Sequence, residues 1–389
     1  MNDLQTGIIT LLKSAVLQQP MPLPEDFRPE EAAKQIKSHQ ITALIYEGAV
    51  CCGIPLKDAF MQKLFQQYCK MVQISERQLQ ALDRIYKAFG ENGIDYMPLK
   101  GCRMKALYPR PELRVMGDAD ILIRTEQYDK ICSVMSCLQF TQKDETDHEL
   151  VWTSDGLYLE LHKRLIPSYN RDYHGYFGDG WSLASHRTGT RYEMTPEDEF
   201  IYLFTHFAKH YRDGGIGCRH VVDLWVYLRA HPELDQEYIC TELEKLQLTE
   251  FYQNIRRLIS VWFEEEASGT KTDFLTEFIF ASGSWGQMEN RVLSRAVRDA
   301  SHSILGFNGK LLYLWQTAFP GVKVLRGKYT ILKKYPFLLP VVWLIRPFYK
   351  VLFERSTLKK QKRNMAAFDQ NGMEDHQKML QYVGLEYHF

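Results

Sequence analysis

Apolar residues in the first part of the chain recur at the spacing of amphipathic helices. Between Lys57 and Phe89 an apolar side chain returns every three to five residues, which predicts one or two helices with a buried stripe. A shorter helix is expected around residues 8–16, and the proline-rich stretch 20–29 separates it from the helices that follow. Residues 1–90 are therefore predicted to form an N-terminal helical lobe.

The hydrophobic pattern then changes to short β-prone runs. Apolar runs at 94–99 and 121–123 predict strands. Two further runs, 150–153 and 157–162, flank a glycine-containing turn, which predicts a β-hairpin. Residues 91–190 are expected to form a core of mixed strands and helices.

Helical periodicity returns in residues 191–305. Thr195 and Pro196 stand before two acidic residues, and this combination of capping hydroxyl, proline and acids is typical of a helix start. The last segment, 306–389, has a different character, because basic residues interleave with aromatic and aliphatic ones in it. It contains twelve Lys or Arg and one acidic residue between positions 323 and 363.

The basic segment 323–363 has two functional interpretations. A membrane-spanning helix needs about twenty mostly apolar residues, and Pro336, Pro340, Arg346 and Pro347 interrupt the apolar run. The segment is instead suited to lie on an anionic membrane surface or to hold a polyanion such as RNA. The alternative without a binding function is a helical appendage whose charged side chains are solvated.

The overall charge and the cysteine content limit the classes of partner and the redox environment that we expect. The chain of 389 residues has 48 basic and 48 acidic residues, so its overall charge does not indicate a nucleic acid or a membrane as partner. Its eight cysteines show no Cys-x-x-Cys spacing, and we expect reduced, mostly buried thiols. The N-terminus lacks the layout of an export signal, and the expected localisation is cytoplasmic.

The candidate chemistry lies around Asp118 and Asp120. Side chains alternate along a strand, so these two carboxylates share one face while Ile121 and Ile123 enter the core. Two neighbouring carboxylates repel each other, and a site that keeps them together usually holds a cation. Mg²⁺ or Mn²⁺ between carboxylates and nucleotide phosphates is the arrangement of a phosphoryl-transfer site.

The order of residues around this pair resembles that of a known family. Leu99-Lys100-Gly101 is followed by Leu107-Tyr108-Pro109, then Arg114, then Asp118-x-Asp120. This order is similar to that of the uncharacterised nucleotidyltransferase family of the polymerase-beta-like nucleotidyltransferase superfamily. The superfamily usually has Gly-Gly or Gly-Ser before the acidic pair. Here Lys100-Gly101 and a longer spacer stand there, as in this family and in abortive-infection nucleotidyltransferases.

The resemblance implies an α+β fold. A polymerase-beta-like core of a small mixed sheet with helices would be flanked by N-terminal and C-terminal helical lobes. The implied activity is the transfer of a nucleoside monophosphate from a nucleoside triphosphate to an acceptor by a two-metal mechanism. The sequence does not identify the acceptor, which is a protein hydroxyl, a sugar phosphate, a small molecule such as an antibiotic, or an RNA end.

A nucleotidyltransferase requires a third carboxylate on a strand beside the acidic pair. Glu160 is the best candidate, because Glu-Leu-His at 160–162 matches the family's acidic-x-His segment. His162 is expected to orient Glu160, to contact substrate, or to be a structural histidine. The alternative is that Glu160 is an ordinary strand residue that points outward. Asp147 and Asp155 compete with it for the role of third carboxylate, but both lie in sequence typical of turns.

Three residues are expected on the phosphate side. Lys100 and Gly101 lie at a predicted strand-to-helix turn, where a glycine allows a ligand to approach the backbone and a lysine adds a positive charge. Arg114 is expected to contact phosphate, or alternatively to pair with Asp118 or Glu112. For Lys100 and Gly101 the alternative is an ordinary turn, with a glycine that has no ligand and a lysine that is solvated.

Four residues further along are assigned only by the resemblance. Lys209, His210, Arg219 and Asp223 are expected to line the nucleotide or acceptor side of the cleft. An Arg219–Asp223 pair on one helix is the structural alternative. His206 and His210 have the spacing of a zinc pair, but no third ligand is evident in the sequence.

The sequence therefore predicts a metal-dependent nucleotidyltransferase with Asp118, Asp120 and Glu160 as catalytic and metal-binding residues. A non-catalytic protein on the same fold, which binds nucleotides, polyanions or a membrane surface, is the alternative function.

Overall fold

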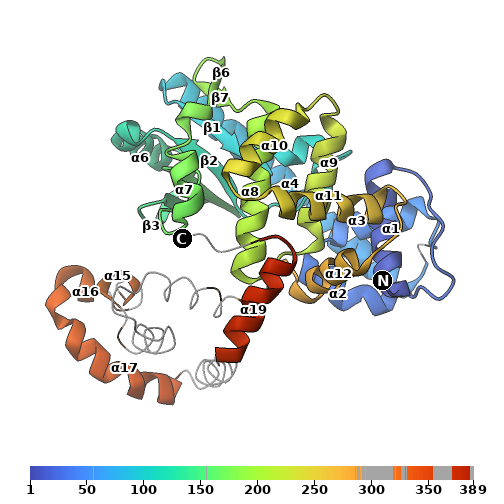
Figure 1. Ribbon diagram of the computed structural model, residues 1–389. Coiled ribbons are helices and arrows are strands. Elements are labelled where there is room, and N and C mark those ends of the chain that lie inside the picture. Colours follow the sequence, from blue (N-terminus) through green and yellow to red (C-terminus); the bar gives the residue numbers. More distant parts are fainter. Residues whose placement is uncertain are drawn as a thin grey trace. The chain divides into compact units, whose positions relative to one another are not determined.

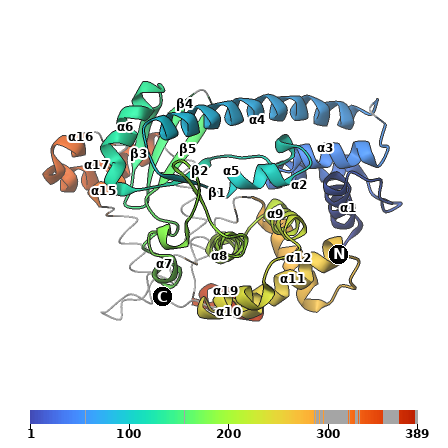
Figure 2. The same ribbon diagram turned by 90° about the horizontal axis from the view of Figure 1, so that it is seen from above.

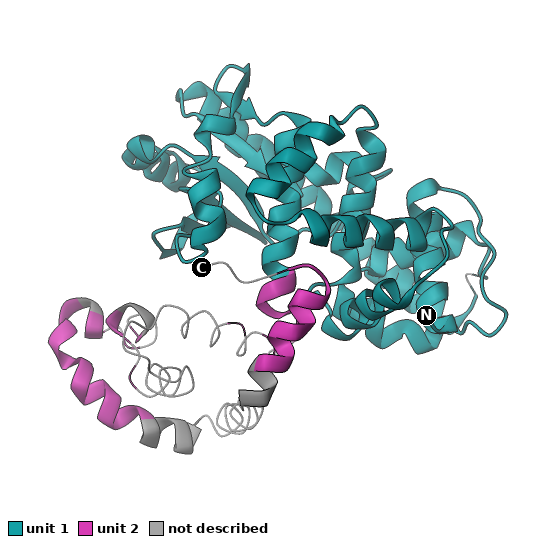
Figure 3. Cartoon of the chain, in the orientation of Figure 1, with its two compact units in different colours: residues 1–210, 216–285 teal, residues 211–215, 286–389 magenta. Residues whose placement is uncertain are grey.

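The structure is a computed structural model. It describes residues 1–55, 57–154, 156–284, 321–325, 331–353 and 370–385, together with the single residues 286, 290, 294, 319 and 329. The chain forms two compact units, one of residues 1–210 and 216–285 and the other of residues 211–215 and 286–389 (Figure 3).

The first unit is built on a seven-stranded sheet with the order β3-β4-β5-β2-β1-β7-β6. The pairs β2–β5 and β1–β7 are parallel and the other neighbours are antiparallel, so the sheet is mixed. The strands are β1 Tyr96–Leu99, β2 Ala119–Ile123, β3 Thr141–Glu145, β4 Glu149–Ser154, β5 Leu157–His162, β6 Ser185–Thr188 and β7 Arg191–Glu193. The predicted α+β fold with a mixed sheet is confirmed, as is the hairpin of β4 and β5, although Asp155 in its turn lies outside the described residues.

The first unit also contains helices, some of which pack against this sheet. They are α1 Asp3–Leu17, α2 Ala33–His39, α3 Thr42–Cys51, α4 Ala59–Glu91, α5 Gly101–Met104, α6 Tyr128–Cys137, α7 Arg171–Phe177, α8 Pro196–Gly214, α9 Cys218–Ala230, α10 Gln236–Lys245, α11 Thr249–Phe263 and α12 Thr270–Ser282. The last residues of α8 belong to the second unit. Short 3₁₀ turns connect them: η1 Pro29–Ala32, η2 Lys105–Leu107, η3 Pro111–Leu113, η4 Thr125–Gln127 and η5 Trp181–Leu183.

One face of the sheet forms the core with α4 and α6. Ile121 and Ile123 of β2 and the leucines of β5 are buried there among apolar side chains of both helices. In Figure 2, α4 and α6 lie on one side of the sheet and α8 lies on the other. The predicted alternation is confirmed, and the apolar stripe of residues 57–89 belongs to a single helix. The opposite face of β2 and β5 is left for polar side chains.

Helices from the two ends of the first unit pack together. Helices α1 to α3 lie beside α11 and α12 (Figures 1 and 2). The side chain of Gln5 donates a hydrogen bond to Glu277 at 3.0 Å, and the Ser284 N–H donates to the Ser38 carbonyl at 2.8 Å. At the start of α8, the Asp198 N–H donates to the Thr195 hydroxyl at 3.1 Å, which confirms the predicted helix start.

The second unit contains α15 Val322–Leu325, α16 Ile331–Lys334, the turn η6 Pro336–Leu338, α17 Leu339–Phe353 and α19 Gln370–Tyr382. Leu325, Leu332 and Val342 form its small core. Residues 354–363 of the basic segment lie outside the described residues. Among the described helices, none combines the length and the apolar character needed to cross a bilayer.

The cysteines differ from expectation in one respect. All eight are described and none forms a disulfide, but only Cys218 is buried, while the others are partly or fully exposed. The prediction of mostly buried thiols is wrong: five of the eight side chains are half-buried and two are exposed, although Cys102 and Cys132 pack against the core.

His39 links three helices of the first unit and provides a test of their packing. It is fully buried at the end of α2, where its Nδ1 accepts from the Cys218 N–H and its Nε2 donates to the Phe280 carbonyl, both at 3.2 Å. Burial lowers the pKa of His39 to about 4, although the bond to Phe280 acts in the opposite direction.

The free energy of unfolding is therefore expected to fall when the pH drops from 6.5 to 4.5. The unfolded chain takes up a proton at His39 in this range and the folded chain does not. Over this pH interval the free energy of unfolding of the native protein should fall by about 2 kcal/mol more than that of His39→Gln, as measured by chemical denaturation. An exposed histidine replaced in the same way, His186→Gln, should leave the pH dependence unchanged. If the free energy of unfolding of the native protein and of His39→Gln changed equally with pH, this would contradict a buried, neutral His39.

Candidate active site

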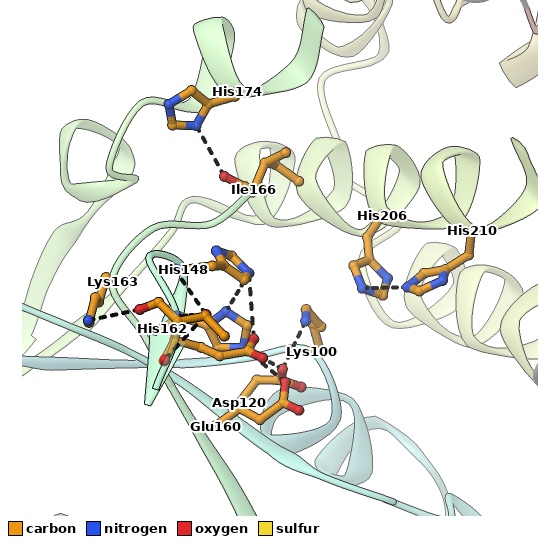
Figure 4. A network of polar contacts seen from close by, with 12 residues as sticks. Lys100, Asp120, His148, Glu160, His162, Lys163, Ile166, His174, His206 and His210 are labelled. Atoms are coloured by element: carbon orange, nitrogen blue, oxygen red, sulfur yellow. Dashed lines mark hydrogen bonds and ion pairs between the residues drawn. The ribbon is translucent and has the colours of Figure 1, made fainter. Parts of the chain in front are cut away.

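Three neighbouring strands bring the candidate residues together. Asp120 on β2 is the register partner of Leu99 on β1 and of Glu160 on β5. The sequence places Lys100 directly after β1, and His162 ends β5 opposite Leu122. Because alternate residues of β2 and β5 enter the core, the side chains of Asp120, Glu160 and His162 emerge on the opposite face (Figure 4).

Asp120 is the centre of this group. Its side chain is only 5% exposed, and its Oδ1 atom lies 2.8 Å from the Lys100 ammonium and 2.7 Å from Nε2 of His162. Burial by itself would raise the pKa of Asp120, but the charge of Lys100 and the hydrogen bond from His162 hold this pKa well below its usual value. Asp120 is therefore a carboxylate at neutral pH.

The same contacts act on the two partners of Asp120. Burial opposes protonation of Lys100, yet the Asp120 carboxylate raises the pKa of this lysine well above its ordinary value. For His162, burial and Lys100 lower the pKa, but hydrogen bonds to Asp120 and Glu160 produce a net increase. The three side chains stabilise one another in their charged or hydrogen-bonded forms.

Two further carboxylates lie near Asp120. Oε2 of Glu160 is 3.6 Å from Nε2 of His162, and ligand atoms of Asp120, Glu160 and His162 all lie within 4.8 Å of one another. Asp118 is partly buried just before β2. Burial and the negative charges of Asp120 and Glu160 raise its pKa, while Lys100 opposes this effect.

This set of donors fits a divalent cation. Carboxylate oxygens are the ligands that Mg²⁺ and Mn²⁺ prefer. Burial is the largest cause of the raised pKa of Asp118, and the negative charges of Asp120 and Glu160 add to it. A bound cation would relieve this repulsion.

Two competitors for the third carboxylate have other positions. Asp147 accepts a hydrogen bond from the Ser168 hydroxyl at 2.8 Å in the turn before β4. Asp155 lies outside the described residues. Glu160 is thus the candidate that the described sheet brings next to Asp120.

His148 belongs to the site although the sequence analysis did not select it. Its Nε2 lies 3.2 Å from Nδ1 of His162, on the side of the ring that faces away from Asp120. Burial, followed by the positive charges of His162, Lys100, Lys209 and Arg164, lowers the pKa of His148 to about 2, so the ring is neutral. A histidine in the turn before β4 carries no sequence signal of its own, since only the β4–β5 pairing brings it to His162.

Helix α8 supplies a second group of polar side chains. Nε2 of His206 lies 3.0 Å from Nε2 of His210, and both rings point from α8 toward the space beside Lys100 and His148 (Figure 4). Burial and the nearby charges of Lys100 and Lys209 keep the pKa of His206 well below its usual value. The three-donor metal groups found in the described part of the chain include neither His206 nor His210, so the zinc alternative gains no support.

The turn at Lys100 differs from a plain glycine turn. Lys100 itself has the positive φ of 42°, and α5 begins at Gly101. A Cβ atom at residue 101 would lie 3.0 Å from the Met116 side chain and 3.2 Å from Nη1 of Arg114. Gly101 therefore permits close packing against the loop before β2, while the conformational strain is at the lysine.

Arg114 has a different partner from those expected. Its guanidinium makes a forked contact with Asp223 of α9, at 3.2 Å to Oδ1 and 2.9 Å to Oδ2. The Tyr108 hydroxyl donates to the same carboxylate at 2.7 Å. The alternative pairing of Arg114 with Asp118 or Glu112 is not the one formed, because Asp223 approaches from a distant part of the sequence, and the expected phosphate contact stays a prediction.

Arg219 also contacts the loop before β2. It donates to the Val115 carbonyl at 2.7 Å, and burial together with the charge of Arg114 lowers its pKa to about 10. The alternative of an Arg219–Asp223 pair within one helix is replaced by these contacts, in which Asp223 binds Arg114 and Arg219 binds the backbone. Both residues of α9 thus hold the loop that leads to Asp118.

Fold and site together define a class of protein. A small mixed sheet that presents carboxylates from adjacent strands, with helices on both sides, is the arrangement expected of a nucleotidyltransferase core. The family described as uncharacterised nucleotidyltransferase matches residues 25–264, which is more than half of the chain. The chain belongs to this family, which confirms the resemblance inferred from its motifs, and the family assignment supports nucleotidyl transfer as the general activity. Neither the curated proteins nor the solved structures contain a match to the chain.

The buried pair of Arg114 and Asp223 can be tested by stability measurements. Asp223→Asn should lower the free energy of unfolding by about 3 kcal/mol, because it leaves the guanidinium buried without a counter-charge. The matched control is Asp95→Asn, which removes the more exposed pair of Asp95 with Arg124 at 2.9 Å and should cost less than about 1 kcal/mol. Chemical denaturation of both variants checks this expectation. Equal losses in the free energy of unfolding would show that α9 does not hold the loop before β2.

Proposed function

We propose that the protein transfers a nucleoside monophosphate from a nucleoside triphosphate to an acceptor hydroxyl and releases pyrophosphate. The observation that carries this proposal is the pairing of Asp120 and Glu160 as register partners on β2 and β5. Asp118 lies two residues before Asp120 and is electrostatically coupled to both. Carboxylates from adjacent strands, rather than from one loop, form a rigid site for this chemistry.

The three carboxylates have distinct roles in the proposal. Asp118, Asp120 and Glu160 would hold two divalent ions, Mg²⁺ or Mn²⁺. When bound, these ions would supply positive charge to the triphosphate and to the attacking oxygen. Glu160 is more exposed than Asp120, at 19% against 5% of the side chain, and we therefore assign it to the acceptor side.

The proposed reaction is a single displacement at the α-phosphorus. The acceptor oxygen forms a bond to this phosphorus, and the bond from the phosphorus to the bridging oxygen of the pyrophosphate breaks. Glu160 accepts the proton of the acceptor hydroxyl. The electron pair of the broken bond leaves with the pyrophosphate.

The triphosphate is assigned to the space between β5 and α8. The positive charges of Lys100, Lys209 and Arg164 each lower the pKa of His148, which supports a positive potential in this region. His206 and His210 of α8 border the same region. In this proposal Lys100 bridges the Asp120 carboxylate and a phosphate oxygen, while Lys209 and His210 contact the nucleotide from α8.

The other residues predicted on the phosphate side receive a positioning role. Arg114 and Asp223 are paired with each other, and Arg219 is bonded to the Val115 carbonyl. We assign these three residues to the loop that carries Asp118, and Gly101 to its close packing. None of the four is required to contact the nucleotide.

The central test measures pyrophosphate release and label transfer with each of the four labelled nucleoside triphosphates in the presence of a cell extract. Asp118→Asn and Asp120→Asn should each lower the rate by about a hundredfold or more, because the metal-binding charge is lost where the transition state needs it. Asp129→Asn, an exposed acid at the start of α6, is the matched control and should retain full activity. A chelator should abolish the transfer, and added Mg²⁺ or Mn²⁺ should restore it.

Two outcomes would contradict the proposal. Transfer that persists when both aspartates are replaced in a folded protein would place the chemistry elsewhere. Nucleotide binding in calorimetry, without pyrophosphate release by the native protein with any triphosphate, would support the non-catalytic alternative on this fold.

A further inference from the structure

The second unit exposes an unusual number of apolar side chains. Of the sixteen large hydrophobic residues that are exposed in the described part of the chain, six lie between residues 331 and 345. They are Ile331 at 50% exposure, Tyr335 at 40%, Phe337 at 75%, Val341 at 48%, Leu344 at 73% and Ile345 at 53%. We refer to these six residues as the apolar face. Tyr335 and Phe337 are in ring contact, with centroids 5.9 Å apart, and Val341, Leu344 and Ile345 share one side of α17 by their spacing. Exposed apolar surfaces usually mark an interaction site.

The apolar face is separate from the core of the second unit. Leu325, Leu332 and Val342 pack inward, and Leu338 and Trp343 lie partly buried against them. The same short helices therefore carry one apolar surface that is packed and another that is exposed. Folding of this unit accounts for the first surface and leaves the second available to a partner.

Positive charge accompanies the apolar face. Lys334 is exposed beside Tyr335, with its Nζ 5.5 Å from the centre of that ring. Arg346 follows Ile345 directly. The sequence from 323 to 363 has twelve basic residues and one acidic residue, so a partner of negative charge is favoured.

We propose that residues 331–346 dock on an anionic lipid bilayer, with α16, η6 and α17 lying in the headgroup layer. Aromatic and aliphatic side chains that enter the boundary of the acyl chains, together with lysine and arginine at the headgroups, are the composition of an interfacial segment. Single-stranded RNA is disfavoured as the partner, because nucleic-acid bases stack on aromatic rings and four of the six residues, Ile331, Val341, Leu344 and Ile345, are aliphatic.

The first experiment is flotation of the full-length protein with lipid vesicles. We expect binding to vesicles that contain phosphatidylserine in phosphatidylcholine, and much weaker binding to phosphatidylcholine alone. The triple variant Phe337→Ser, Leu344→Ser, Ile345→Ser should lower the ratio of bound to free protein by about tenfold or more. The matched control replaces three exposed apolar residues of α4, by Phe65→Ser, Val72→Ser and Ile74→Ser, and should bind like the native protein.

The second experiment tests the charge without altering the apolar face. Lys334→Glu should lower binding to phosphatidylserine vesicles by about fivefold or more, and the remaining binding should weaken less with added salt than that of the native protein. The exposed Lys63→Glu of α4 is the control and should have no effect. This variant keeps the proposal testable if the triple variant does not fold.

Several results would overturn the proposal. The first is that the native protein does not bind anionic vesicles. The second is that both the triple variant and Lys334→Glu bind these vesicles as well as the native protein does. The third is that a single-stranded RNA oligonucleotide binds the protein more tightly than the vesicles do and displaces it from them. Dimer formation that is lost in the triple variant, with no vesicle binding, would assign the apolar face to a second copy of the chain.

Discussion

The structure of the site depends on the compensation of one buried negative charge. Asp120 receives the Lys100 ammonium and His162 Nε2 on the same oxygen, at 2.8 and 2.7 Å. These contacts join the end of β1, the start of β2 and the end of β5, so the meeting point of three strands is fixed by charge as well as by backbone pairing. Removal of Lys100 would leave the buried Asp120 carboxylate without its positive counter-charge, a change that typically costs about 3 to 5 kcal/mol. The positive φ of Lys100 is tolerated because this ion pair holds the residue in place.

A second layer of buried polar contacts supports the loop between β1 and β2. Lys105 is 2% exposed and donates at 2.9 Å to the Ser75 hydroxyl and to the carbonyls of Pro111 and Arg114. Burial lowers the pKa of Lys105 to about 8. Arg114 then reaches Asp223. The segment between β1 and β2 contains only α5 and two short 3₁₀ turns. Side chains of α4 and α9 hold its backbone, which explains why charged residues are buried there.

Negative and positive side chains lie next to one another in the site. Asp120 and Glu160 emerge from the sheet with Asp118 just before β2, Lys100 pairs with Asp120, and the charges of Lys100, Lys209 and Arg164 help to keep His148 neutral. Adjacent regions of negative and positive charge suit a ligand that brings cations and phosphates together. The apolar face of the second unit has a different chemistry, with exposed aliphatic side chains beside lysine and arginine, and its proposed partner is correspondingly different.

Much of the fold was determined by local sequence patterns. The stripe of α4, the capping residues before α8, the β4–β5 hairpin and the alternation of Asp120 with Ile121 are read directly from period and turn chemistry, and the motif order identified the family. Strands β3 and β6 were not predicted, because nearly all their residues are exposed and they lack an alternating apolar signal. The partners of charged residues were decided only by the tertiary structure: Arg114 pairs with Asp223 across 109 residues, Lys100 binds Asp120, and His148 reaches His162. Hydrophobic periodicity is a property of neighbouring residues, whereas a buried charge is compensated by whichever group the fold brings within a few ångströms of it.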